Sequence, residues 1–155
     1  MDQTKNDSPE FQKFASDLRE LLELISLYQG RSRYYAGNVP LFPAEVHLMC
    51  HIEEGITGVT ELANYERKTK SAISQIVTRI HKKGLVEKTP GEVSRREIVL
   101  KLTEEGKKIT DYHKEVEKQL FTEIWERMGS APEQQRLEGS SLLLQALRES
   151  YEARF

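Results

Sequence analysis

Cysteine is nearly absent from this sequence, since Cys50 is the single one among 155 residues. One cysteine cannot form a disulfide within the chain, which suits a reducing cytoplasm. Apolar residues nowhere run for the roughly 20 positions that a membrane-spanning helix needs. Residues 1–10 are polar and contain no apolar segment of the secretory kind. We therefore expect a soluble, cytoplasmic protein without a membrane partner.

The motifs of common catalytic sites are missing as well. The sequence contains no glycine-rich phosphate loop, no nucleophile elbow and no pair of acids clustered in a loop. Cys50 falls within the apolar helical segment 46–52, and cysteine is among the residue types most often buried. A structural role for Cys50 is therefore favoured over redox sensing. The sequence does not predict an enzyme, and no cofactor is required.

The net charge of −2 conceals an uneven distribution of charge along the chain. Residues 57–108 contain 12 basic and 7 acidic side chains, whereas the rest of the chain contains 11 and 18. Positive charge gathered in one third of a chain suits attraction to nucleic-acid phosphates. A solvated basic face has the same composition, so charge alone leaves both interpretations open.

Apolar residues at helical spacing predict long amphipathic helices at both ends of the chain. The first covers about residues 10–30, and the last two cover about 107–128 and 132–154. Another helix starts at Pro43, which suits a first helical position, and ends near residue 54. The terminal helices carry more apolar surface than a small central domain can cover. We expect them to pair two copies of the chain.

The centre of the chain predicts a helix-turn-helix. Residues 59–65 form a short helix, 66–68 a polar turn and 69–83 a second helix. One face of that second helix is apolar and consists of Ile73, Ile76, Val77 and Ile80. The opposite face holds hydroxyls, an amide and cations without an acid: Ser71, Ser74, Gln75, Thr78, Arg79 and Lys82. Because such side chains hydrogen-bond to base edges and phosphates, this is the predicted recognition helix.

A β-hairpin is predicted directly after the second helix. Gly84 ends that helix, residues 85–89 and 98–102 form two strands, and Pro90-Gly91 marks a turn. The tip between the strands holds Ser94, Arg95 and Arg96. It is either a basic finger that reaches a minor groove or a plain surface hairpin, and its place after a groove-type helix favours the finger. Two flanking cations complete the predicted DNA-contacting set: Lys70 and Lys88.

Five short segments, taken in order and with their spacing, resemble the MarR family of winged-helix regulators. They are residues 60–63 (TELA), 71–74 (SAIS), 84–86 (GLV), 94–96 (SRR) and 100–106 (LKLTEEG). The resemblance implies a mainly α fold with a small β wing, in one domain over residues 1–155. A winged helix-turn-helix at 40–106 would lie between dimerisation helices at 10–36 and 107–155. The sequence departs from the family at Ser94, where the family has an aspartate that braces an arginine.

The resemblance implies a homodimer that binds double-stranded DNA in a sequence-specific way and regulates transcription, as a ligand-responsive repressor. One recognition helix per chain predicts a pseudo-palindromic operator whose half-site centres lie about one helical turn, ~10–11 bp, apart. The alternative from another class is a winged helix that binds proteins without specific DNA binding. The acid-free face of the second helix argues against that alternative.

The resemblance also implies an effector site. In the zinc-sensing branch of the family the ligands come from two helix regions, and His47, His113 and Glu117 resemble three of those ligands. His113 falls on an apolar stripe, and Glu117 follows it by one helical turn, which can present two ligands to one ion. Residues 29–38 contain no carboxylate to supply a fourth. A metal ion, a small-molecule effector and a purely structural role remain the three alternatives for these residues.

Overall fold

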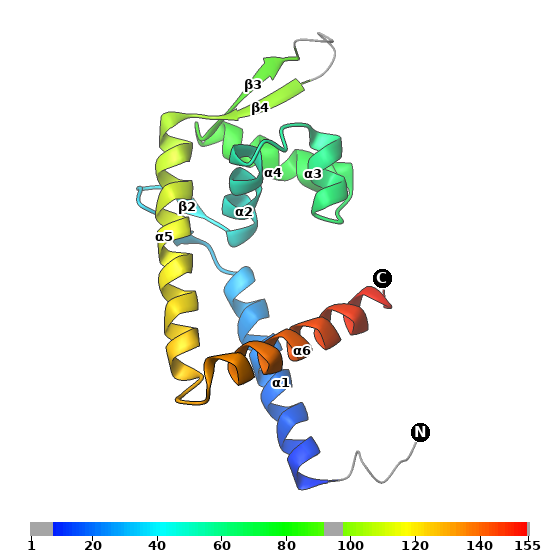
Figure 1. The fold of residues 1–155 in the computed structure, drawn as a ribbon. Helices are drawn as coiled ribbons and strands as arrows, with labels where there is room; N and C mark the ends of the chain where they lie inside the picture. The colour runs from blue at the N-terminus through cyan, green and yellow to red at the C-terminus, as the bar shows by residue number, and fades with distance from the viewer. Residues whose placement is uncertain (1–7, 92–97, 155) are drawn as a thin grey trace. The chain divides into compact units, whose positions relative to one another are not determined.

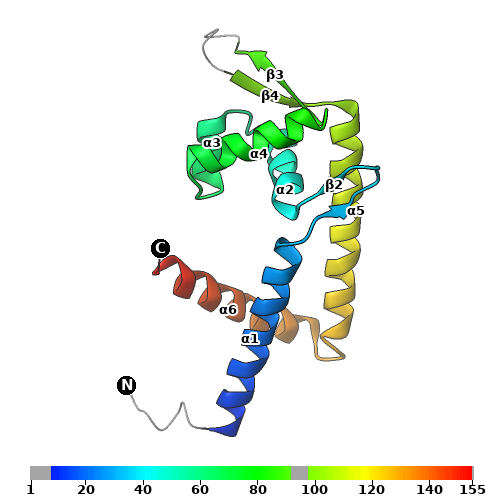
Figure 2. The ribbon, with the colours of Figure 1, turned by 180° about the vertical axis from the view of Figure 1, so that it is seen from behind.

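The computed structural model describes residues 8–91 and 98–154, which belong to two compact units, 1–114 and 115–155. Figures 1 and 2 show the order of the elements. The first unit contains α1 (Pro9–Gln29), β1 (Arg33–Tyr34), β2 (Pro40–Leu41), α2 (Pro43–Glu53), α3 (Val59–Tyr65), α4 (Lys70–Lys82), β3 (Val86–Pro90), β4 (Ile98–Leu102) and the start of α5 (Glu104–Arg127). The second unit contains the rest of α5 and α6 (Glu133–Glu152). A mainly α fold with a small β wing is therefore confirmed.

Helix α1 has well-formed ends but buries none of its residues within its own chain. The Ser8 hydroxyl accepts a hydrogen bond from the backbone N–H of Phe11 at 3.1 Å, and Pro9 occupies the first turn. After the helix, the Arg33 guanidinium lies 3.5 Å from the centre of the Tyr28 ring and donates to the Tyr28 carbonyl at 2.7 Å. Local contacts thus fix where α1 begins and ends, while most of its large apolar side chains remain exposed.

The stretch after α1, which the sequence predicts only as polar and aromatic, contains a small β-ladder. Arg33 pairs with Leu41 and Tyr34 with Pro40 in an antiparallel register. Strands of two residues give no alternating pattern, so the sequence carries no signal for them. The ladder places Tyr35 and Leu41 in the hydrophobic core.

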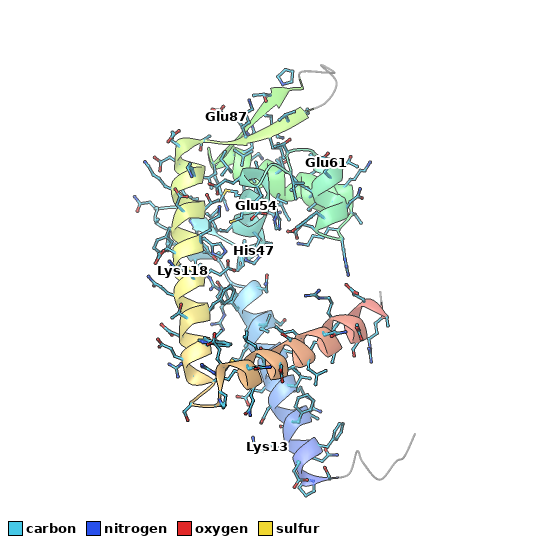
Figure 3. All side chains as sticks on the ribbon, viewed as in Figure 1. Lys13, His47, Glu54, Glu61, Glu87 and Lys118 are labelled. Atoms are coloured by element: carbon cyan, nitrogen blue, oxygen red, sulfur yellow. The ribbon has the colours of Figure 1, made fainter. Side chains whose placement is uncertain are left out.

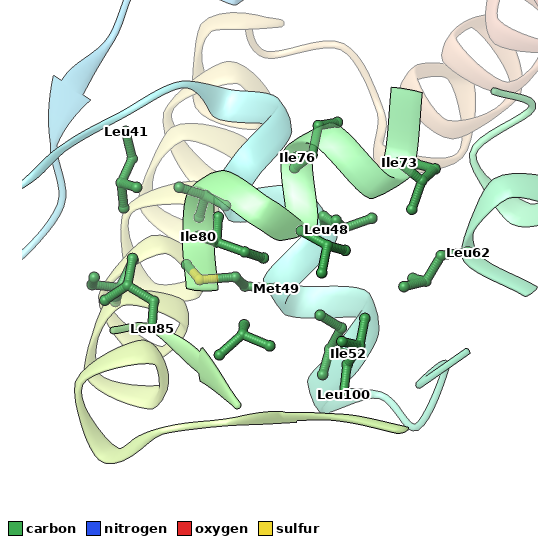
Figure 4. Close-up of a cluster of buried hydrophobic side chains, with 14 of the residues drawn as sticks. Leu41, Leu48, Met49, Ile52, Leu62, Ile73, Ile76, Ile80, Leu85 and Leu100 are labelled. Atoms are coloured by element: carbon green, nitrogen blue, oxygen red, sulfur yellow. The ribbon is translucent and has the colours of Figure 1, made fainter. Parts of the chain in front are cut away.

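The core of the first unit forms around α2, which contacts α1, α4 and β4. Figure 4 shows side chains of this core, among them Leu48 of α2 and Ile80 of α4. Helix α4 contributes Ile73, Ile76, Val77 and Ile80, the four residues that the periodicity predicts. Burial of each such side chain is worth roughly 1.5–3 kcal/mol. Because these four residues pack into the core, the opposite face of α4 stays exposed to water.

The wing is a two-stranded ladder anchored to the helices. Strands β3 and β4 pair from Val86↔Leu102 to Pro90↔Ile98, and Gly58 adds one further bridge to Val99. Near the base, the Thr103 hydroxyl donates to the Gly84 carbonyl at 2.8 Å and accepts from the Gly106 N–H at 3.1 Å. The predicted hairpin is confirmed at its strands, while Ser94, Arg95 and Arg96 lie outside the described residues.

The second unit joins the end of α5 to α6 by a turn. Gly129 adopts a φ of +86°, which favours glycine at this position. The Arg136 guanidinium lies 4.4 Å from the centre of the Trp125 ring and donates to the Trp125 carbonyl at 3.1 Å. Helix α6 buries no residue within the chain. Among the described residues, no helix combines the length and apolar character that crossing a membrane requires.

Candidate nucleic-acid interface

Helices α3 and α4 are held in a helix-turn-helix by local capping. The Glu61 carboxylate accepts the Gly58 N–H at 3.3 Å at the start of α3, and the Thr69 hydroxyl accepts the Ala72 N–H at 3.1 Å at the start of α4. In the turn, Arg67 has a φ of +52° and the Lys68 N–H donates to the Ala63 carbonyl at 2.9 Å. These bonds set the direction in which α4 leaves the turn.

The outer face of α4 is exposed along its whole length. A shallow groove of about 370 Å³ follows it, lined by Ser71, Ser74, Gln75, Thr78 and Arg79. Lys70 and Lys82 at the two ends of the helix are also exposed. The structure therefore gathers, on one accessible surface, every residue of α4 that the sequence predicts to contact DNA. We call this surface the α4 face.

The wing carries one described member of the predicted contact set. Lys88 of β3 is exposed. The wing is tied to α4 through His81, whose Nδ1 lies 2.7 Å from the Val86 carbonyl oxygen. It is tied to α5 by close packing, because a Cβ on Gly106 would lie 2.1 Å from the Leu85 carbonyl oxygen. The first contact therefore connects the wing to the recognition helix, and the second connects the base of the wing to α5.

One acidic residue lies against the α4 face and belongs to α2. Glu45 is completely buried, and its Oε1 accepts Arg79 Nε at 3.1 Å while its Oε2 accepts Lys83 Nζ at 2.8 Å. Burial alone would raise the pKa of Glu45, but hydrogen bonds from Lys83, the Phe42 N–H and Arg79 outweigh it and lower the pKa. Glu45 is the third residue of a helix that begins at Pro43, a position at which a glutamate often caps the helix, so its capping role has a signal in the sequence. Its pairing with Arg79, 34 residues away, has none.

A second carboxylate, the partly buried Glu53, links α2 to α5. Glu53 Oε1 accepts Lys107 Nζ at 2.9 Å, and Oε2 accepts Lys114 Nζ at 2.9 Å. Burial would raise the pKa of Glu53, yet the hydrogen bonds from Lys114 and Lys107 outweigh it and lower the pKa to about 2. These two ion pairs connect α5, the helix that follows the wing, to the C-terminal end of α2.

The structure brings together two of the three predicted effector residues. His113 of α5 is buried, as predicted, and its ring centre lies 5.3 Å from that of His47. Figure 3 labels His47 on α2. The Tyr35 ring contacts His113 edge-on with 5.8 Å between centres. Glu117 follows His113 by one turn in α5 and belongs to the second unit. We call Tyr35, His47 and His113 the aromatic cluster.

The donor set at the aromatic cluster does not make a metal site by itself. A zinc site in a protein has three or four protein ligands. Within residues 8–91 and 98–154, no group of three or more histidine, cysteine or acidic side chains is arranged to hold a metal ion. The cluster consists instead of two neighbouring imidazoles and a buried phenol whose rings contact one another.

Comparison with known proteins shows the fold. No sequence-family model matches the chain, and no curated protein sequence matches it either. Solved structures do. A zinc-responsive MarR family member, ZitR of Lactococcus lactis, is 15% identical, with a TM-score of 0.71 over 90% of this chain and 97% of that one. FabT of Streptococcus pneumoniae, solved in complex with DNA, is 20% identical, with a TM-score of 0.68 over 90% and 98%.

A third neighbour is the adhesin competence repressor AdcR of Streptococcus pyogenes. It is 18% identical, with a TM-score of 0.68 over 91% of this chain and 97% of that one. The similarity covers nearly the whole of each chain. The arrangement of helices and wing described above is therefore the winged-helix fold of MarR-type regulators.

Proposed function

We propose that this chain is a sequence-specific, double-stranded DNA-binding transcriptional regulator that acts as a homodimer. The α4 face is the observation that carries the proposal. It presents hydroxyls, an amide and cations in an exposed groove, and no residue of α4 is acidic. Serine, threonine, glutamine and arginine are the side chains that hydrogen-bond to base edges in a major groove. A neighbour of the same fold solved with DNA supports this use of the fold.

The competing function is a winged helix that binds another protein. An interface for a protein partner usually has an apolar centre. The α4 face has none, because its isoleucines and valine are buried in the core. The wing strands add two exposed lysines, Lys88 and Lys101, and of their large apolar side chains Ile98 alone is exposed, to 53%. The α4 face and the wing strands therefore favour a phosphate-bearing partner over a protein.

Homodimerisation is supported by the apolar side chains that the terminal helices leave in water. In α1 these include Phe14, Leu21 and Leu24, and in the second unit they include Leu120, Phe121, Leu142 and Leu144, each at least 48% exposed. Apolar surface of this extent on separate long helices is typical of a surface covered by a partner. We propose a second copy as that partner, since the neighbours' fold and the two-fold symmetry of most operators agree with it.

We further propose that the regulator responds to a small effector at the aromatic cluster, and that DNA release by this ligand makes the chain a repressor. His47 and His113 of the cluster lie on α2 and α5, two helices that the ion pairs of Glu53 connect to each other, and Tyr35 lies between β1 and β2. A ligand that binds two conformations unequally shifts the balance between them.

The hypothesis that the effector is a metal ion requires Glu117 to join His47 and His113 as a ligand. Zinc titration into metal-free wild type and His113→Ala tests it: equal and weak binding to both proteins removes the metal version.

Selection from a random pool of 20-bp duplexes tests the DNA-binding function. The wild-type protein should enrich a pseudo-palindromic motif with half-site centres ~10–11 bp apart. Recovery of a pool without a motif would contradict the proposal. A variant with Gln75 and Arg79 both changed to alanine is the matched control, because it keeps the buried face of α4 intact.

A further inference from the structure

The starting observation is the buried carboxylate of Glu45. It lies at the start of α2, where its Oε2 also accepts the Phe42 N–H at 2.9 Å. The two cations that reach it come from α4 and from the residue after α4. Lys83 donates in addition to the Pro40 carbonyl at 3.0 Å. All partners of this carboxylate therefore belong either to the start of α2 or to the region of the recognition helix.

A buried carboxylate is tolerated only when it is paired and hydrogen-bonded. Here three donors meet its two oxygens, and these donors hold the pKa of Glu45 below its ordinary value. The group is therefore an anion at neutral pH. It supplies a fixed negative charge directly behind the edge of the α4 face at Arg79.

Arg79 is the residue of the α4 face that this anion holds. Only its Nε donates to Glu45, and the side chain is 48% exposed. Within the described part of the chain, no hydrogen bond engages its terminal Nη1 and Nη2 groups. Those two groups form the fork that arginine presents to a guanine edge. An arginine tethered at Nε has already lost much of the rotamer freedom that a free one loses on binding.

We propose that Glu45 is a positioning residue for sequence discrimination: it aims the Nη fork of Arg79 at one base of the operator. This inference rests on the proposed DNA-binding function. Glu45 itself touches no DNA, because it is completely buried. The negative charge of Glu45 also offsets the positive charge of Arg79, which weakens the attraction of this surface to phosphates in general. At the same time it favours one orientation of the Arg79 side chain. Glu45 therefore lowers the affinity for random duplex and raises the preference for the operator.

Two effects of Glu45→Gln should move in opposite directions. Glutamine keeps the cap on the Phe42 N–H but removes the charge that holds Arg79. Affinity for random duplex should rise, because one negative charge near the DNA surface is lost. The ratio between preferred and random duplex should fall by roughly two- to twelve-fold, which is the cost of ordering one freed long side chain. A residue with only a structural role would lower both affinities together.

The experiment uses the full chain and the duplex that wild-type protein enriches from the random pool. Dissociation constants are measured for that duplex and for a scrambled one, with wild type, Glu45→Gln, Arg79→Ala and the double variant. Glu53→Gln is the matched control, because Glu53 is also an α2 carboxylate that pairs with two cations. Its two partners, Lys107 and Lys114, belong to α5 instead of the region of α4. Glu45→Asp, which retains the charge and retracts the carboxylate, is the second variant if Glu45→Gln does not fold.

The expected result is a lower discrimination ratio for Glu45→Gln, an unchanged ratio for Glu53→Gln, and no further loss from Glu45→Gln once Arg79 is alanine. For Glu45→Asp the ratio should fall without a gain in random-duplex affinity. An unchanged ratio, or the same loss with and without Arg79, would overturn the inference while leaving DNA binding in place. A wild-type protein that enriches no motif would overturn the proposed function and this inference with it.

Discussion

At the scale of single residues, the α4 face combines exposed polar side chains with a buried carboxylate, Glu45, that lies behind Arg79. Helical periodicity alone separates the buried Ile73, Ile76 and Val77 from the exposed Gln75 and Thr78. The partnership of Arg79 with Glu45 depends on how two helices pack, and no local pattern encodes it. The face is acid-free along α4 but has an acid behind it.

Gln75 and Arg79 should carry base recognition. Replacing either by alanine should cost roughly 1–3 kcal/mol on the preferred duplex and narrow its advantage over random duplex, because a base-edge contact is lost. The wing arginines, by contrast, should read phosphates and groove width, so Arg95→Ala or Arg96→Ala should weaken both duplexes more evenly. Fluorescence anisotropy titrations measure both. Equal loss on the two duplexes for Arg79→Ala would contradict its role.

Substitution of Gly106 should destabilise the fold for a steric reason. Adding a Cβ places a carbon 2.1 Å from the Leu85 carbonyl oxygen, so the wing base or α5 must move. Gly106→Ala should therefore lower the free energy of unfolding by roughly 1–3 kcal/mol, as in other overpacked sites. Gly139→Ala is the control, since a Cβ there meets nothing within 4 Å, and it should stabilise α6 by roughly 0.5–1 kcal/mol. Thermal or urea unfolding that ranks the two variants the other way would refute the packing argument.

At the scale of elements, the sequence predicts the helices, whose apolar residues recur periodically. It does not predict very short strands or contacts between residues that lie far apart in the chain. The bounds of α2, α3 and α4 agree with the predictions within about a residue, because caps and apolar spacing mark them. The β1–β2 ladder was missed because two-residue strands have no period. The link from α2 to α5 through Glu53 was missed because its partners lie 54 and 61 residues away.

The Glu53 link should make stability depend on pH in a defined window. The folded pKa of about 2 lies below the ordinary value of 4.5, so the contribution is complete above about pH 4.5 and is lost as the pH falls towards 2. Both lysines are about half exposed, so solvent screening reduces the contribution to about 1–2 kcal/mol.

Glu53→Gln measures that contribution directly. Wild type should be the more stable protein at pH 7, and the difference in free energy of unfolding should shrink as the pH drops from 4.5 towards 3. Urea titrations at one fixed protein concentration give the comparison, since association also changes apparent stability. A difference that stays constant between pH 7 and pH 3 would show that the ion pairs contribute nothing.

At the scale of the whole molecule, apolar side chains on the terminal helices require an explanation outside the single chain. Helices α1 and α6 bury no residue within it, although both are amphipathic. Helix periodicity predicts such faces, and only the structure shows that the chain itself leaves them uncovered. Association of two copies would remove this surface from water and place two α4 faces in one particle.

The oligomeric state should follow from that surface. Light scattering at micromolar concentration should give twice the mass of the chain. Leu142→Glu, at a leucine that is 70% exposed in α6, should shift the protein towards monomer because a charge cannot be buried unpaired in an apolar interface. Glu138→Lys, on the same helix at an exposed polar position, is the control and should leave the mass unchanged. A wild-type monomer would refute the proposed dimer.

The central claim is that the α4 face reads duplex sequence. The most direct measurement is the ratio of dissociation constants for the enriched and the scrambled duplex, determined across a series of salt concentrations. We predict a preference of at least about 10³-fold for the enriched duplex at physiological salt, together with a steep loss of affinity for both duplexes as salt rises. Equal dissociation constants for the two duplexes at every salt concentration would contradict the claim.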